Sequence, residues 1–211
     1  MAILNRLRSD SLHHRQPGII GEEHHYMTAV LVPLIYNQDQ ELCVVLEKRA
    51  LTLRRQAGEI CFPGGGMELG DIDPLATAIR ECCEELRLDA DDIEYLFPLD
   101  ILLTPFNLKL YPYVGYIENP AKIDPSPAEV DSILIVPLNW LLTHPPREEW
   151  IPVSMQPGDD YPYHLIPGGR DYPWFPAHYP HLFYEWEGAV IWGLTARILD
   201  HFLHLITPLI D

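Results

Sequence analysis

The sequence has little positive charge, few cysteines and no long apolar run. Its 211 residues include 31 Asp and Glu but only 14 Lys and Arg, which gives a net charge of −17. Duplex nucleic acid is therefore not expected as a partner, because phosphate binding needs clustered cations. No apolar stretch approaches the roughly 20 residues that span a bilayer, and no secretion signal is evident at the N-terminus. We expect a cytoplasmic protein that binds no membrane.

The four cysteines are too few for a disulfide framework. Cys82 and Cys83 are adjacent on a predicted helix, where neighbouring side chains diverge. Buried, reduced thiols are the expected state, and no Cys/His spacing indicates a zinc site. The length suits one core. We predict a polar leader over residues 1–26 and a single domain over 27–211.

Hydrophobic patterning predicts an α/β (α+β) fold. Strands are expected at 27–36, 41–47, 59–62, 95–103, 109–118 and 132–136, the first two forming a hairpin around a turn at 37–40. Residues 145–184 are rich in proline and aromatics, so long irregular excursions are expected there. A terminal amphipathic helix should run from about Ile191 to Leu205, before Pro208. Strands on both sides of a central helix predict a mixed β-sheet between helices, an α/β/α sandwich.

The central helix is predicted to start after Asp73, a good N-cap, with Pro74 in the first helical position. Apolar residues then recur at helical spacing, at Ala76, Ile79, Cys83 and Leu86. This stripe is expected to anchor the helix on the sheet.

The same helix carries three carboxylates, Glu81, Glu84 and Glu85, at spacings that place them on one face. Carboxylates so close repel one another unless a cation lies among them, and hard oxygen ligands suit Mg²⁺ or Mn²⁺. Taken alone, the run is more typical of a solvated acidic face.

Three neighbouring features favour the metal interpretation. The glycines Gly64, Gly65 and Gly66 precede the helix and would let the backbone approach a phosphate or the metal. Asp71 lies between these glycines and the helix, where it could pair with Arg80. Four cations just before the glycines supply counter-charge for an anionic ligand. They are Lys48, Arg49, Arg54 and Arg55.

Residues 65–88 resemble the Nudix box. The correspondence runs from Gly65 through Asp71 to the block Arg80-Glu81-Cys82-Cys83-Glu84-Glu85 and ends at Arg87-Leu88. Asp71 replaces the usual Glu, the following spacer is one residue longer, and Arg87 stands where the box has Gly. A left-handed C-cap at Arg87 would cost roughly 1 kcal/mol but removes no ligand.

A second motif resembles the coenzyme A diphosphatase branch of this family. It runs from Arg49-Ala50 through Arg54 and Gly58 to Phe62-Pro63-Gly64-Gly65. Glu47 stands upstream, where that branch usually has Thr. The resemblance implies a Nudix-type fold and hydrolysis of the pyrophosphate of coenzyme A, to 3′,5′-ADP and 4′-phosphopantetheine.

The resemblance also implies roles for individual residues. Glu81, Glu84 and Glu85, with Gly65, would hold the divalent ions, while Arg80 would orient the box through Asp71. Arg49 and Arg54 would bind the substrate phosphates beside Gly64 and Gly65. Glu129 would supply a further metal ligand or a base, although a solvated loop position is an equal alternative.

Two other functions stay open on the sequence. One is a Nudix hydrolase of ADP-ribose or another nucleoside diphosphate derivative, and the other is a catalytically silent, nucleotide-binding protein of the same fold. Aromatic residues over 161–184 are expected to pack in the core or to form a face between two copies of the chain, a homodimer. No site residue is assigned there.

Overall fold

The computed structural model describes residue 14 and residues 18–210. The predicted leader falls largely outside these residues. Within them, an eight-stranded sheet is ordered β3-β2-β1-β7-β5, with β4 paired to β1, β6 to β7 and β8 to β2. The strands are β1 (Tyr26–Tyr36), β2 (Leu42–Arg49), β3 (Ile60–Cys61), β4 (Gly64–Gly66), β5 (Ile93–Pro98), β6 (Leu102–Leu103), β7 (Leu108–Ile117) and β8 (Val130–Pro137). Because β1 and β7 run parallel while the other pairs are antiparallel, the sheet is mixed, as predicted.

The predicted hairpin between β1 and β2 is confirmed, with Leu34 opposite Val44. Its turn is held by the Asn37 side chain, whose Oδ1 accepts from the backbone N–H groups of Asp39 and Glu41. Such a side-chain bond is the reason asparagine favours turns. The expected strand at 95–103, in contrast, is divided into β5 and β6.

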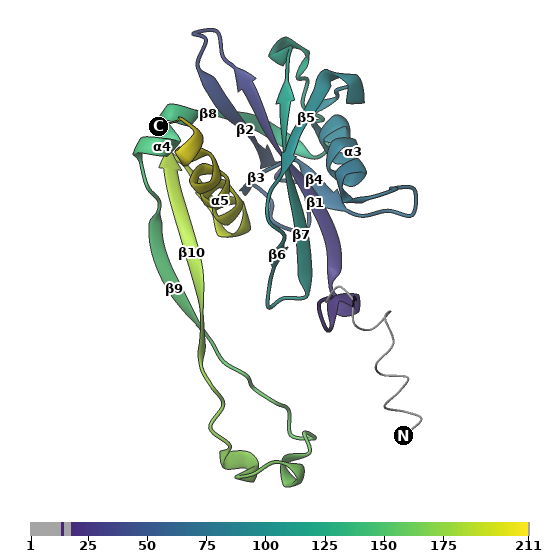
Figure 1. Cartoon of the computed structure of the whole chain (residues 1–211), viewed down its shortest axis with the longest axis vertical. Coiled ribbons are helices and arrows are strands. Elements are labelled where there is room, and N and C mark those ends of the chain that lie inside the picture. The colour runs from purple at the N-terminus through teal and green to yellow at the C-terminus, as the bar shows by residue number, and fades with distance from the viewer. Residues whose placement is uncertain (1–13, 15–17, 211) are drawn as a thin grey trace.

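Helices cover both faces of the sheet (Figure 1). They are α3 (Pro74–Leu86), α4 (Leu138–Thr143) and α5 (Gly193–Ile210), and short 3-10 turns lie at η1 (Glu22–His24), η2 (Ala90–Asp92) and η3 (Pro120–Lys122). One apolar core lies between α3 and the sheet and includes Ala29 and Leu31. The other lies on the α5 side and includes Val32 and Leu34, the alternate residues of the same strand. The predicted α/β/α sandwich is confirmed.

Helix α3 begins as its sequence predicts. Asp73 Oδ1 accepts a hydrogen bond of 2.8 Å from Ala76 N, and Pro74 occupies the first helical position. The helix ends at Arg87, whose left-handed backbone (φ 51°) lets its N–H bond to the Cys83 carbonyl. The predicted C-cap conformation is therefore present without a glycine.

The predicted apolar stripe of α3 is confirmed in part, because Leu86 is buried and Ile79 and Cys83 pack half-buried against the same core. The residues that are buried against the sheet are Ala78, Cys82 and Leu86. Ala76, Ile79 and Cys83 are only half-buried. The face of α3 that points to the sheet also contains the polar residues Thr77 and Glu85, which a search for apolar residues at helical spacing does not detect.

Residues 145–184 are more regular than expected. Strands β9 (Arg147–Val153), β10 (Ala177–Trp186) and β11 (Ala189–Trp192) form a second antiparallel sheet. The β9–β10 hairpin extends away from the main sheet as a long arm, whose tip carries the 3-10 turns η4 (Tyr163–Leu165) and η5 (Gly169–Asp171) (Figure 1). The prediction of irregular excursions therefore applies only to the tip.

The aromatic residues of the arm tip do not join the main core. Tyr161 and Tyr172 pack edge-on against Trp174, and Phe175 is 89% exposed. Of the two alternatives for this segment, core packing is thus wrong at the tip, while a homodimer face stays a prediction.

The terminal helix α5 differs from its predicted bounds. Ile191 lies in β11, Leu205 is exposed and Pro208 lies within the last turn. Among the described residues, no helix combines the length and apolarity needed to cross a membrane.

Candidate active site

The glycine segment forms the centre of the site. Gly64, Gly65 and Gly66 are not a free loop but the short strand β4, in which Gly65 pairs with Ala29 of β1. At Gly64 (φ 156°) a Cβ would lie 2.4 Å from the Ala29 carbonyl oxygen, and at Gly65 it would lie 2.5 Å from the Glu81 carboxylate carbon. A side chain at either position would collide with the sheet or with the acidic helix.

The three predicted carboxylates lie at different depths. Glu85 is buried, at 4% exposure, and its Oε2 accepts a hydrogen bond of 2.9 Å from Gly64 N. Glu81 is half-buried beside Gly65, and Glu84 is exposed. Helix α3 therefore directs Glu85 and Glu81 toward β4 and leaves Glu84 at the rim.

Asp71 and Arg80 form the predicted ion pair. Arg80 Nε and Nη2 donate to the two Asp71 carboxylate oxygens at 3.0 and 3.1 Å, and Nη2 also donates to the Gly66 carbonyl. The guanidinium holds the pKa of Asp71 well below its usual range. Arg80 Nη1 lies 2.9 Å from Glu81 Oε1, so one side chain connects the segment after β4 to the acidic helix.

Two further carboxylates converge on Glu85. Glu129 comes from the segment before β8 and is held in place where its carbonyl accepts from Ala50 N at 2.8 Å. Glu47 lies on β2, fully buried, with Cys61 Sγ donating to its Oε1 at 3.3 Å. Burial raises the pKa of Glu85, and the charges of Glu47, Glu81 and Glu129 raise it further. Burial likewise raises the pKa of Glu47 and of Glu81.

The donor set suits a divalent cation. Four carboxylates gather beside a backbone strand free of side chains, and the raised pKa values of Glu47, Glu81 and Glu85 mean that their ionised forms need a nearby positive charge. Among the described residues, no group of three acidic, thiol or imidazole side chains is arranged so that it could hold a metal ion as it stands. The fit rests instead on an orphaned atom, because the buried Glu47 Oε2 has no hydrogen-bond donor among these residues.

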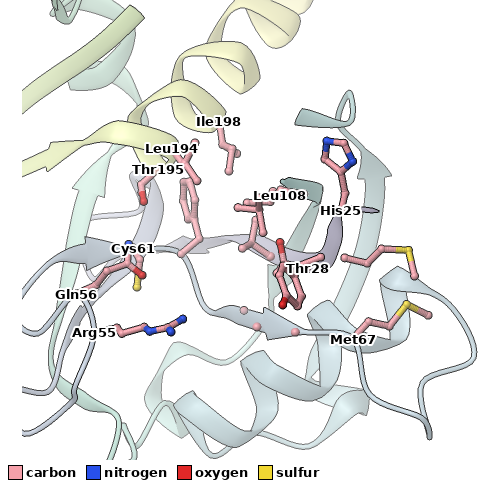
Figure 2. A pocket seen from close by; sticks show the side chains of 18 of the residues that line it. His25, Thr28, Arg55, Gln56, Cys61, Met67, Leu108, Leu194, Thr195 and Ile198 are labelled. Atoms are coloured by element: carbon pink, nitrogen blue, oxygen red, sulfur yellow. The ribbon is translucent and has the colours of Figure 1, made fainter. Parts of the chain in front are cut away.

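A cavity of about 1030 Å³ borders the acidic cluster. Gly64 and Gly65 line the cavity and also lie against the acidic cluster, since Gly64 N donates to Glu85 and a Cβ at Gly65 would meet the Glu81 carboxylate. Figure 2 shows Arg55, Gln56 and Cys61 close together on the left of the cavity, with Leu194 and Thr195 above them and His25 and Met67 at the far side. The cavity is therefore cationic near Arg55, and the rest of its wall mixes apolar with polar side chains.

Two residues that line the cavity each have a buried polar atom without a hydrogen-bond partner in the described part of the chain. Arg49 Nε and Thr28 Oγ1 are buried and have no hydrogen-bond partner in the described residues. Buried polar atoms are normally satisfied, so unpaired donors here indicate a place for a polar ligand.

Some but not all of the residues expected to bind phosphate line the cavity. Arg49, Gly64 and Gly65 line the cavity, which leaves their binding of phosphate a prediction. Arg54 is exposed and is not among the lining residues, whereas its neighbour Arg55 is. Sequence reasoning also assigned no role to Glu47, although its departure from the branch pattern was visible.

Residues 25–155, more than half of the chain, match the NUDIX domain family. The chain belongs to the Nudix family. It is 31% identical over 171 residues to the uncharacterized Nudix hydrolase NudL of Photorhabdus laumondii, with 81% of this chain and 80% of that protein covered.

Two other relatives have more specific names. Over 154 residues the chain is 31% identical to the peroxisomal coenzyme A diphosphatase NUDT7 of Mus musculus, covering 68% of this chain and 61% of that protein. Over 180 residues it is 32% identical to the mitochondrial Nudix hydrolase 15 of Arabidopsis thaliana, covering 81% and 55%. The chain thus spans about half the length of this plant relative. These relatives are named for peroxisomes and mitochondria, so a cytoplasmic location stays a prediction.

Proposed function

We propose that this protein is a divalent-cation-dependent hydrolase that splits the pyrophosphate bond of coenzyme A or a derivative, giving 3′,5′-ADP and 4′-phosphopantetheine or its acyl form. One observation carries the proposal. Arg49 and Thr28, each with a buried polar atom that has no partner in the described residues, line a large cavity whose glycine strand β4 also lies against Glu81 and Glu85. An anionic ligand in the cavity and a cation among the carboxylates would satisfy both sets.

The chain's own residues would divide the chemistry. Glu81, Glu84 and Glu85, with the Gly65 main chain, would hold Mg²⁺ or Mn²⁺. Once bound, the cation would lower the pKa of an attacking water and neutralise charge on the pyrophosphate. Arg80 keeps Glu81 and β4 in register through Asp71 and Gly66.

Glu129 would act as a base or as an additional ligand, because it faces the same cluster. Little covalent work is left for the protein, so positioning and charge stabilisation would account for most of the rate.

The mixed lining of the cavity supports coenzyme A over ADP-ribose. A coenzyme A molecule joins an anionic nucleotide to a long arm with few charges, whereas ADP-ribose is polar at both ends. Arg49 and Arg55 supply positive charge for an anionic nucleotide, and Leu108, Leu110 and Leu194 supply apolar surface in the same cavity. Burying an uncharged arm against these leucines would add affinity that ADP-ribose cannot obtain.

The proposal is tested by comparing kcat/KM for coenzyme A and ADP-ribose with Mg²⁺ and with Mn²⁺. We expect coenzyme A to be favoured, and mass spectrometry in ¹⁸O-water should find the label in one of the two phosphate products. Equal or reversed preference would contradict the coenzyme A assignment. Absence of hydrolysis of any dinucleotide would instead favour a silent binding protein.

A pair of neighbouring variants locates the contact to the 3′-phosphate of coenzyme A. Arg55→Ala should lower kcat/KM for coenzyme A about tenfold more than for dephospho-coenzyme A, because a charge-assisted hydrogen bond contributes about 1.5 kcal/mol or more. Arg54→Ala is the matched control, since it removes the same charge one residue away and outside the cavity lining. Selective loss in Arg54→Ala alone would restore the assignment made from the sequence.

A further inference from the structure

Glu47 is a buried carboxylate that the proposed function leaves unused. It lies on β2 with no exposed surface, in a register opposite Cys61 of β3. Its Oε1 accepts from the Cys61 thiol, a weak donor, and its Oε2 has no donor partner in the described residues. A carboxylate buried with so little compensation costs several kcal/mol unless another charge is present.

No neighbouring cation forms an ion pair with Glu47 in the described part of the chain. Arg49, two residues along the same strand, lowers the pKa of Glu47 through its charge, but burial outweighs that effect and Arg49 Nε is itself unpaired. Arg80 is committed to Asp71 and Glu81. Glu85, also buried, interacts directly with Glu47.

A shared proton is the simplest way to hold two facing carboxylates together. It would suffice for Glu47 and Glu85 alone. Here the carboxylates of Glu81 and Glu129 also act on Glu85, and a single proton does not balance these additional charges. A divalent cation balances them better, and it also gives Glu47 Oε2 the partner that it lacks.

We propose that Glu47 is an additional ligand of the divalent cation, contributed by β2 from the side opposite to the Glu81 and Glu85 ligands of α3. The site would then be held between the sheet and the helix rather than by the helix alone. This inference rests on the proposed function for the existence of the cation site, but it makes a separate claim about one side chain.

The test is Mn²⁺ binding by the metal-free full-length protein, followed by the EPR signal of free Mn²⁺. Glu47→Gln keeps the size of the side chain and removes its charge. We expect it to weaken Mn²⁺ binding by about tenfold to a hundredfold. Its melting temperature without metal should be equal to or above that of the wild type, because a buried charge has been removed. Glu59→Gln is the matched control, since Glu59 precedes β3 and is not buried. It should bind Mn²⁺ like the wild type.

The outcomes separate the inference from the proposed function. Wild-type Mn²⁺ affinity in a folded Glu47→Gln variant, with affinity lost in Glu85→Gln, would overturn the inference alone. A wild-type protein that binds no Mn²⁺ would overturn the proposed function as well. If Glu47→Gln does not fold, a wild-type crystal soaked in Mn²⁺ decides the matter by anomalous scattering. An ion about 2.1 Å from a Glu47 oxygen supports the inference, and an ion bound without Glu47 overturns it.

Discussion

The two faces of the main sheet are built from the same strands but differ in chemistry. On the α5 side, Val44 and Leu46 of β2 pack with Phe202 in a core of aliphatic and aromatic side chains. On the α3 side the alternate residues begin with Cys43 and Val45 but end with the buried Glu47. Apolar burial on the α5 side stabilises the fold, which allows the α3 side to contain the buried, incompletely paired carboxylate of Glu47. The stability of the fold and the chemistry of the acidic cluster can therefore be perturbed separately.

The largest expected effect is on the α3 face. Glu85→Gln should lower turnover roughly a thousandfold, equivalent to about 4 kcal/mol of transition-state stabilisation, because it removes a buried cation ligand. Thermal unfolding should show a folded protein whose melting temperature is not reduced. Turnover near the wild-type value would contradict the metal assignment and remove the chemical distinction between the faces.

The next effect belongs to the α5 face. Phe202→Ala should lower the free energy of unfolding by about 3 to 4 kcal/mol, because Phe202 is almost completely buried. Urea unfolding measures the loss, and Leu205→Ala on the exposed side of the same helix is the control. The folded fraction should keep kcat within about twofold of the wild type. A kcat loss as large as that of Glu85→Gln would break the comparison.

The smallest effect concerns the end of α3. Arg87→Gly should raise the free energy of unfolding by about 0.5 kcal/mol, because glycine adopts the left-handed conformation without strain. The gain is reduced by loss of the exposed ion pair to Asp124, which contributes little. Arg87→Ala loses the same ion pair but keeps the strain, so chemical denaturation should rank it below Arg87→Gly. The reverse order would show that the backbone at Arg87 is unstrained.

Local rules predicted the parts of the molecule that local contacts determine. The turn at Asn37, the N-cap at Asp73 and the left-handed C-cap at Arg87 all depend on bonds within a few residues. The Asp71–Arg80 pair was also predictable, because its partners bracket the start of one helix.

The rest depends on which strands pair. Gly65 becomes part of a strand only because β1 lies beside it, and Glu85 turns inward only because α3 packs with Ala78 and Cys82 against that strand. The helical spacing placed Glu85 on one face with Glu81 and Glu84 and did not reveal that Glu85 is buried. Arg55 rather than Arg54 lines the cavity, because the side chains of neighbouring residues point in different directions.

Arg80 links the charges on helix α3 to the conformation of the segment between β4 and α3. The same guanidinium bonds to the Gly66 carbonyl, to Asp71 and to carboxylates of α3, so the exposed stretch between β4 and the helix shares its counterion with the acidic turn. A substitution at Glu68, Leu69 or Gly70 that shifts Asp71 would thereby redistribute charge over Glu81 and Glu84 without touching either. The charge distribution of this site can thus be tuned by substitutions at positions outside the acidic cluster.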